Sequence, residues 1–484
     1  MFIHKLLYEN AEKYPDHIAL EFNGESISYK QLYKLMISAA IKLKKLGLTS
    51  EDKLLIFAPN SPEFVIAFFS SMYLGSIVVL ADTKYNQELK NIIIENKLKF
   101  IVTDEFYTQK IDKVFNSMSQ NERKLMEDMN TILTSQLREC SNEIDLSIEP
   151  GHKELDDEAL ILYTSGSRGT PKGVINTNRT LYEALCNYQQ TVPITSSDRL
   201  VAVTPFFHSY AMGSCMLAGL GSGATLILQE SFQPKKIIRL IEKEKATIFH
   251  GVPYMYSLIN EQYQQELQDF ESLKLCVSAG GALSRSVAER FYELTHKVIH
   301  QEYGSSETGT ISINLNESVD LNILSVGQAL KNVQVRVTNM IDQDVGLIEV
   351  KNKGHSKGYL GKEQFGCDWY STGDLGKIDS EGYIYILGRE KRMINLSGLK
   401  VDPSEVERVI ASHDGVAEVL VRGLEHEDFG EIVEALVVRK NCILEEINLI
   451  DLCKKNLALY KVPKLIRWVD ELPKTSLGKV RNGH

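Results

Sequence analysis

The stretch YTSGSRGTPKG at residues 163–173 combines hydroxyl side chains, glycines and a lysine directly after the apolar run EALIL at 158–162. Glycines let backbone N–H groups approach phosphate oxygens, hydroxyls add donors, and Lys172 adds a point charge. The stretch is not a Walker A loop, because Lys172 stands between Pro171 and Gly173. It predicts a polyphosphate-binding loop at the end of a buried strand, with a flexible surface turn as the alternative.

Apolar, β-branched runs alternate with segments of helical periodicity on both sides of this loop. The runs are LLIFA at 54–58, IVVLA at 77–81, FIVT at 100–103, ALILYT at 159–164, LVAVT at 200–204, TLIL at 225–228, TIFHGV at 247–252 and LKLCVSAG at 273–280. PKKIIRLIEKEKA at 234–246 is typical of the helical segments. The alternation predicts an α/β fold, with a large, multi-layer N-terminal domain of mostly parallel sheets.

A second domain is expected near the C-terminal end, because 484 residues exceed one ordinary core. The stretch from Gly388 to Ile410 indicates a strand end, a charged turn and a helix introduced by Pro403. We therefore expect an N-terminal domain over 1–388 and a small α+β domain over 389–484. The stretch at 106–158 is hydrophilic and predicts surface helices and a linker.

The segment from Phe64 to Ala81 is uncharged over a length that could just cross a bilayer. Gly75 and Ser76 divide it into a helix-like and a β-branched part, so we expect a buried helix feeding a buried strand and no transmembrane segment. The N-terminal residues place Ile3 on one helical face with other apolar residues, which predicts a packing helix rather than a secretory leader.

Composition narrows the class of partner and the compartment. A formal net charge of −10 argues against a nucleic-acid partner, which would require clustered Lys and Arg. The seven cysteines form no C-x-x-C pair, which indicates reduced thiols and a cytoplasmic location.

The loop at 163–173 resembles the phosphate loop of the adenylate-forming superfamily of acyl-CoA synthetases, adenylation domains and luciferases. Further motifs similar to that family follow in its order across almost the whole chain. They are FFHSYAMG at 206–213, SAGGALS at 278–284, YGSSETG at 303–309, KGYLG at 357–361, YSTGDLG at 370–376, GREKRMINLSGLKVDPSEVE at 388–407 and PKTSLGK at 473–479. The resemblance implies that a carboxylate attacks the α-phosphate of ATP, pyrophosphate leaves, and the acyl group passes to a thiol.

The resemblance also implies the nucleotide-binding residues. They are Thr164, Ser165, Gly166, Ser167, Gly169, Thr170, Lys172, Gly280, Gly281, Ala282, Tyr303, Gly304, Ser306, Asp374, Arg389 and Lys479. Glu307 and Thr164 would hold Mg²⁺, for which a carboxylate is a suitable hard ligand. Tyr303 would stack on adenine with residues 280–282 on its other side, and Asp374 would accept hydrogen bonds from the ribose, with Arg389 beside the same nucleotide.

Lys479 resembles the family's catalytic lysine, which bridges the reacting carboxylate and the α-phosphate. The resemblance makes the C-terminal domain a mobile lid that rotates between the two half-reactions, with Lys391 as its hinge. Two positions depart from the family pattern: Arg168 replaces the usual Thr, and only VRNGH follows Lys479.

His208 matches a position near the substrate carboxylate in acyl- and aryl-CoA synthetases, although a buried core histidine is the alternative. Amino-acid-activating relatives have Asp at this position, so an ordinary α-amino acid is a less favoured substrate. Tyr210, Met212 and residues 251–254 are candidates for the acyl pocket or for core.

The leading hypothesis is therefore an acid–thiol ligase that uses ATP, Mg²⁺ and coenzyme A on a small-molecule carboxylic acid. Transfer to the phosphopantetheine of an acyl or peptidyl carrier protein is a close rival. A catalytically silent nucleotide-binding or scaffold protein is disfavoured by Glu307, Asp374, Arg389 and Lys479, and no residue indicates a luciferase-like oxygenase. The sequence leaves fatty, aryl and small branched acids open.

Overall fold

A computed structural model describes residues 1–124, 129–138, 148–164, 171–263, 269–318, 323–341, 344–362, 364–366, 368–390, 393–396, 399–426, 430–440 and 444–472. Packing divides the chain into two compact units. Unit 1 comprises Met1–Gln334 and Lys351–Asp368, and unit 2 comprises Val335–Val350 and Trp369–His484. Residues 369–388 thus pack with the C-terminal part of the chain, and the functional boundary at 388/389 stays a prediction.

A seven-stranded sheet forms one layer of unit 1 in the described part of the chain. Its order is β18 (Gly358–Tyr359), β8 (Lys172–Thr177), β7 (Glu158–Thr164), β4 (Ile77–Leu80), β3 (Lys53–Phe57), β5 (Phe100–Thr103) and β6 (Asn130–Leu133). The strands from β7 to β6 are parallel to their neighbours, whereas β8 runs antiparallel to both β7 and β18.

A second, nine-stranded sheet in unit 1 has the same parallel character at its centre. Its order within the described residues is β15 (Gln328–Ala329), β14 (Gly309–Ile313), β13 (Ile299–Ser305), β12 (Leu275–Ser278), β11 (Ile248–Gly251), β9 (Arg199–Ala202), β10 (Thr225–Leu228), β1 (Ile18–Phe22) and β2 (Glu25–Ser28). All eight apolar runs expected to be strands are strands, and the expected α/β fold with mostly parallel sheets is confirmed.

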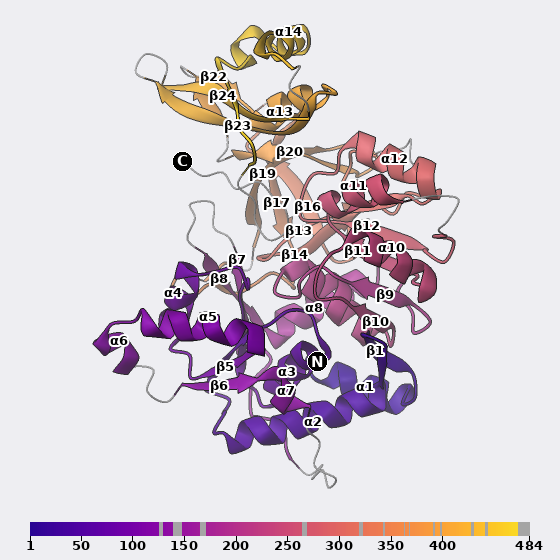
Figure 1. The fold of residues 1–484 in the computed structure, drawn as a ribbon, viewed down its shortest axis with the longest axis vertical. Coiled ribbons are helices and arrows are strands. Elements are labelled where there is room, and N and C mark those ends of the chain that lie inside the picture. Colours follow the sequence, from indigo (N-terminus) through magenta and orange to yellow (C-terminus); the bar gives the residue numbers. More distant parts are fainter. Residues whose placement is uncertain are drawn as a thin grey trace. The chain divides into compact units, whose positions relative to one another are not determined.

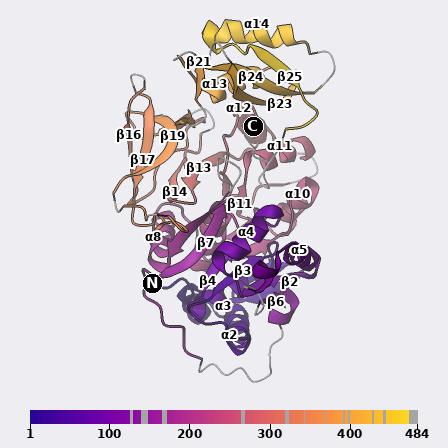
Figure 2. The same cartoon turned by 90° about the vertical axis from the view of Figure 1, so that its left-hand side faces the viewer.

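Helices cover these sheets (Figures 1 and 2). Those described in unit 1 are α1 (Lys5–Lys13), α2 (Tyr29–Lys45), α3 (Pro62–Tyr73), α4 (Gln87–Asn96), α5 (Glu105–Asn116), α6 (Gln120–Lys124), α7 (Thr134–Leu137), α8 (Asn178–Gln189), the π-helix η1 (Ala211–Leu217), α9 (Ala218–Gly221), α10 (Pro234–Lys243), α11 (Pro253–Gln262) and α12 (Arg285–Thr295). The helices expected at the N-terminus and at Pro234 are present.

The uncharged segment at 64–81 forms the buried helix α3 and the buried strand β4, as expected. No helix among the described residues is both long enough and apolar enough to cross a membrane. The hydrophilic segment at 106–158 contains surface helices, but it also contains β6, which the sequence did not predict.

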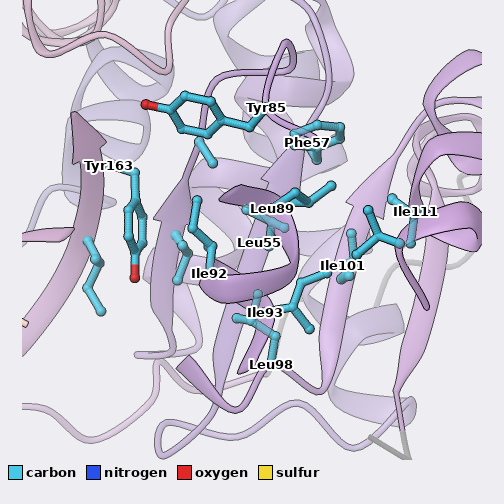
Figure 3. Close-up of a cluster of buried hydrophobic side chains, with 14 of the residues drawn as sticks. Leu55, Phe57, Tyr85, Leu89, Ile92, Ile93, Leu98, Ile101, Ile111 and Tyr163 are labelled. Atoms are coloured by element: carbon cyan, nitrogen blue, oxygen red, sulfur yellow. The ribbon is translucent and has the colours of Figure 1, made fainter. Parts of the chain in front are cut away.

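Apolar side chains from β3, β5, α4 and α5 form the core beside the seven-stranded sheet (Figure 3). Leu55, Leu89 and Ile101 are fully buried there. Tyr163 of β7 belongs to the same cluster. The strand that leads into the predicted phosphate loop is therefore anchored in the core of unit 1.

Unit 2 contains two small sheets in its described part. The first has the order β16 (Gln334–Thr338), β17 (Gly346–Lys351), β19 (Tyr370–Ile378) and β20 (Ile384–Arg389). The second combines β22 (Leu399–Val401), β21 (Ile394–Leu396), β24 (Gly430–Arg439), β23 (Val416–His426) and β25 (Leu465–Trp468) with α13 (Pro403–Ala411), α14 (Glu446–Asn456) and the 3₁₀ turn η3 (Leu459–Lys461). The expected helix does begin at Pro403, and Asp402 caps it by accepting from the Ser404 backbone N–H.

Candidate active site

The strands β7 and β8 form an antiparallel hairpin that positions both ends of the predicted phosphate loop. Thr164 pairs with Lys172 across the hairpin. The Oη atom of Tyr163 donates to Glu95 Oε2 at 2.9 Å and accepts from Asn96 Nδ2 at 2.7 Å, so α4 holds the strand from behind. Thr164 and Lys172 thus stand side by side on a fixed support.

Glycine is required where β8 passes this tyrosine. A Cβ atom at Gly173 would lie 2.9 Å from Ile161 Cγ2 and 3.1 Å from Tyr163 Cζ. These distances are too short for a side chain unless the strand moves. The glycine therefore keeps Lys172 close to the buried strand β7.

Glu307, the predicted magnesium ligand, is held by Tyr359 of β18. Tyr359 Oη donates to Glu307 Oε1 at 2.7 Å. The Nζ atom of Lys172 lies 4.9 Å from the centroid of the same tyrosine ring, within the range of a cation–π interaction. One aromatic side chain therefore contacts both the phosphate-loop lysine and the predicted metal carboxylate.

Backbone and hydroxyl hydrogen bonds fix the loop around Glu307 from two directions. Ser306 Oγ donates to Ser209 Oγ at 3.0 Å, which joins the loop to the segment that carries His208. The Ser356 N–H donates to the Glu307 carbonyl at 2.7 Å, from the segment that precedes β18. The YGSSETG segment is thus braced between two other predicted site segments.

Tyr303 and Gly304 lie near the end of β13, and Tyr303 is half-buried. A Cβ atom at Gly304 would lie 2.4 Å from the Gly309 carbonyl oxygen, so only glycine fits between β13 and β14. Residues 280–282 follow β12 as an exposed turn, in which Gly280 has a φ of +80°. Because β12 and β13 are adjacent parallel strands, both segments emerge at the same edge of the sheet.

His208 lies just before η1, and its ring packs against Phe207 with centroids 4.7 Å apart. Removal from water lowers the pKa of His208 from 6.5 to about 4, and the Asp82 carboxylate opposes this shift. The imidazole is therefore neutral at physiological pH. The influence of Asp82 was not foreseen, because this residue lies in the distant loop after β4.

A buried polar cluster behind Tyr303 was missed by sequence reasoning. Glu302 is only 6% exposed. Its Oε1 accepts from Ser214 Oγ at 2.6 Å and from Thr310 Oγ1 at 2.7 Å, and its Oε2 accepts from Tyr188 Oη at 3.3 Å. Tyr188 Oη also lies 3.4 Å from Nε2 of the buried His250.

In unit 2, Asp374 and Arg389 face each other across the β19–β20 ladder. Arg389 Nε lies 2.7 Å from Asp374 Oδ1, and the Asp374 side chain is 7% exposed, against 52% for Arg389. Thr372 Oγ1 accepts from the Asp374 backbone N–H at 3.1 Å. The two residues predicted to bind the same nucleotide therefore already contact one another.

Several predicted positions lie outside the described residues. They are Ser165, Gly166, Ser167, Arg168, Gly169, Thr170, Lys391 and Lys479. Their predicted roles remain predictions.

The chain matches the family model described as AMP-binding enzyme over residues 7–360 and the model of the AMP-binding enzyme C-terminal domain over residues 405–479. The chain belongs to the AMP-binding enzyme family. The predicted membership of the adenylate-forming superfamily is thereby confirmed.

The similarity between this AMP-binding enzyme and its relatives covers almost the whole chain. A long-chain-fatty-acid–CoA ligase of Bacillus subtilis is 26% identical over 99% of this chain and 93% of its own length. A 2-succinylbenzoate–CoA ligase of Oceanobacillus iheyensis is 30% identical over 98% of this chain and 97% of its own.

A solved structure of o-succinylbenzoate CoA synthetase from Bacillus subtilis, in complex with its acyl-adenylate intermediate, is also similar to this AMP-binding enzyme. It is 27% identical, has a TM-score of 0.87 and covers 99% of this chain and 97% of its own. The predicted enzyme class is therefore confirmed at the level of the family, since the named relatives are acid–CoA ligases.

Proposed function

We propose that the protein activates an organic carboxylic acid as an acyl-adenylate with release of pyrophosphate, and then transfers the acyl group to the thiol of coenzyme A. The observation that carries this proposal is the contact of Tyr359 with both Glu307 and Lys172 beside the β7–β8 hairpin. A cation and a carboxylate held close together suit a polyphosphate with its counter-ion. The naming of the relatives as CoA ligases supports the second half-reaction.

The donor set fits Mg²⁺. Glu307 offers a carboxylate and Thr164 a hydroxyl, both hard oxygen ligands. Tyr359 engages Glu307 Oε1, and the described residues place no hydrogen-bond donor on Oε2. When bound, Mg²⁺ would neutralise developing phosphate charge. Among the described residues, no group of three or more His, Cys, Asp and Glu side chains could hold a metal, and Glu307 and Thr164 are the residues that would hold Mg²⁺.

Five described residues of the candidate site then have proposed roles. Lys172 would bind phosphate oxygens, and Tyr303 would stack on adenine. Asp374 would accept from the ribose hydroxyls, with Arg389 beside it. His208 would meet the acid as a neutral imidazole, because its pKa is lowered to about 4.

Outside the described residues, Ser165, Gly166, Ser167, Gly169 and Thr170 would complete the phosphate loop. Lys479 would bridge the reacting carboxylate and the α-phosphate, and Lys391 would act as the hinge between half-reactions. A cytoplasmic location is part of the same proposal.

The test is an exchange assay between ATP and labelled pyrophosphate over fatty, aryl and small branched acids, followed by mass spectrometry of thioesters. We expect one acid class to support exchange that depends on Mg²⁺. Thioester formation with coenzyme A supports the proposal, whereas loading of only a phosphopantetheinylated carrier protein would replace its second step. No exchange with any acid would contradict the first step.

A further inference from the structure

The carboxyl group of Glu302 joins the two predicted site segments from inside the core of unit 1. Ser214 belongs to η1, which follows the segment with His208, while Thr310 belongs to β14 and Tyr188 to α8. All three donate to this carboxyl. Four elements therefore meet at one side chain next to Tyr303.

We propose that Glu302 is a positioning residue for adenylation, which fixes Tyr303 and the following Glu307 loop relative to η1 and to His208, which lies just before η1. This inference rests on the proposed function. Glu302 contacts neither reactant in this scheme and acts through the backbone of β13 and through the hydroxyl groups of its neighbours.

The composition of the cluster favours a role beyond packing. Burying a carboxyl group lowers the stability of the folded protein unless the group is hydrogen-bonded. Replacing such a group by an apolar side chain of similar volume often leaves the protein as stable. Within the described residues, neither Lys nor Arg pairs with Glu302, and three hydroxyl groups donate hydrogen bonds to its carboxyl oxygens instead. Hydrogen bonds of fixed direction define the register between elements more sharply than apolar contacts do.

The hydrogen bond between Ser214 and Glu302 starts from a π-helical turn. Ser214 lies in the middle of η1, where the backbone departs from α-helical geometry. Such turns are rare and are frequent at functional sites. The 2.6 Å bond from Ser214 to Glu302 fastens this turn to β13, so a change at either end alters the spacing between His208 and Tyr303.

Other titratable groups lie near Glu302 on α8, η1 and β11, whereas β14 carries none. They are Tyr188 of α8, Tyr210 and Cys215 at η1, and, through Tyr188, His250 of β11. Burial raises the pKa of the three Tyr and Cys groups and lowers that of His250 to about 3, so all four are uncharged near neutrality. Glu302 itself has a pKa raised from 4.5 to about 7 by burial.

The experiment compares S214A and T310V with S70A and T103V. Ser70 and Thr103 are also buried, and each donates to a backbone carbonyl away from the cluster. AMP affinity by calorimetry and the kcat and KM of pyrophosphate exchange are measured together with Tm. We expect S214A and T310V to weaken AMP binding and lower kcat/KM about 5-fold, and the matched controls to change both less than about 2-fold at a similar loss of Tm.

The E302Q variant keeps the size and most hydrogen bonds of the Glu302 side chain but removes its ionisable group, so it separates the positioning role from the effect of charge. It also provides a test if S214A or T310V does not fold. We expect E302Q to retain at least about one third of the kcat and to lose an inflection near pH 7 in the kcat/KM profile. If the losses of AMP affinity and kcat/KM correlate with the loss of Tm in all variants, cluster and control alike, the inference is overturned while the proposed function stands. Absence of AMP binding by the unaltered protein would overturn both.

Discussion

The phenol of Tyr359 donates a 2.7 Å hydrogen bond to the carboxylate of Glu307, although 52 positions separate them in the chain. Tyr359 packs edge-to-face on Phe365, with ring centroids 5.0 Å apart, so the phenol is held in place. The bond orients the carboxylate predicted to bind Mg²⁺, as partners of metal ligands commonly do.

Replacement of Tyr359 by Phe should therefore weaken the use of Mg²⁺ and ATP while it preserves the ring beneath Lys172. We expect kcat/KM for ATP to fall about 10-fold and the Mg²⁺ concentration for half-maximal exchange to rise. The control is Y73F, which removes a 2.6 Å hydrogen bond to the Ile148 carbonyl elsewhere in unit 1. Equal Mg²⁺ dependence in Y359F and the unaltered protein would contradict the assignment of Glu307.

The pair of Asp374 and Arg389 should act as one unit toward the nucleotide. R389M leaves a largely buried carboxylate without its ion pair, and D374N removes the charge itself. We expect each to raise the KM for ATP about 10-fold, and the double variant to be less impaired than the product of the two effects. The control pair is Arg336 and Glu349 in the same small sheet, 2.7 Å apart, whose E349Q variant should leave the KM unchanged. Multiplicative effects of D374N and R389M would argue against a shared role.

Glu302 should make the folded protein less stable as the pH rises. Its folded pKa of about 7 lies above its ordinary 4.5, so the folded state binds more protons between these values. The free energy of unfolding of the unaltered protein, relative to E302Q, should fall by about 3 kcal/mol from pH 4.5 to pH 7.5 and level off above that. Urea unfolding at several pH values checks this, and a flat difference between the two proteins would refute the shifted pKa.

Lys479 should be required for adenylation alone. We expect K479A to lose acyl-AMP formation, because the reacting carboxylate and α-phosphate lose their shared cation, yet to convert supplied acyl-AMP and coenzyme A to thioester. K474A, which alters another lysine in the same motif, is the matched control. Intact ATP–pyrophosphate exchange by K479A would sink the assignment.

Lys391 should matter for the opposite step. Proline fixes φ, so K391P should spare adenylation and impair thioester formation if this residue is the hinge. K391A keeps the backbone free and should retain both steps. Equal damage to both half-reactions in K391P would speak against a hinge at this position.

The sequence predicted the fold correctly where the polarity of the side chains matches their burial. The run containing Leu160, Ile161 and Leu162 is apolar because the strand is buried, so periodicity and β-branching were enough to predict it. The strand β6 was missed because its sequence NTIL offers one buried residue, Ile132, within a hydrophilic segment. The π-helix at 211–217 was missed because its apolar sequence fits an α-helix equally well.

The site was predictable in its motifs but not in its contacts. The sequence indicated Glu307 and Lys172, and it contained Tyr359 within the quoted KGYLG segment without a role for it. The contact between these residues depends on the antiparallel pairing of β8 with β18, which only the fold supplies. Glu302 was not predicted as a buried site residue because a Glu next to a loop is usually exposed to solvent.

The alternation of the chain between the two units has a consequence for biosynthesis. The strands β16 and β17 are synthesised before β19, the partner strand of β17, and the intervening residues Lys351–Asp368 pack in unit 1. Until β19 is synthesised, β17 has no strand on that edge, and an unpaired strand edge is prone to misassociation. A fragment that starts at residue 389 would omit β16, β17 and β19 altogether, so a truncation at the motif boundary would release the C-terminal part without one of its two sheets.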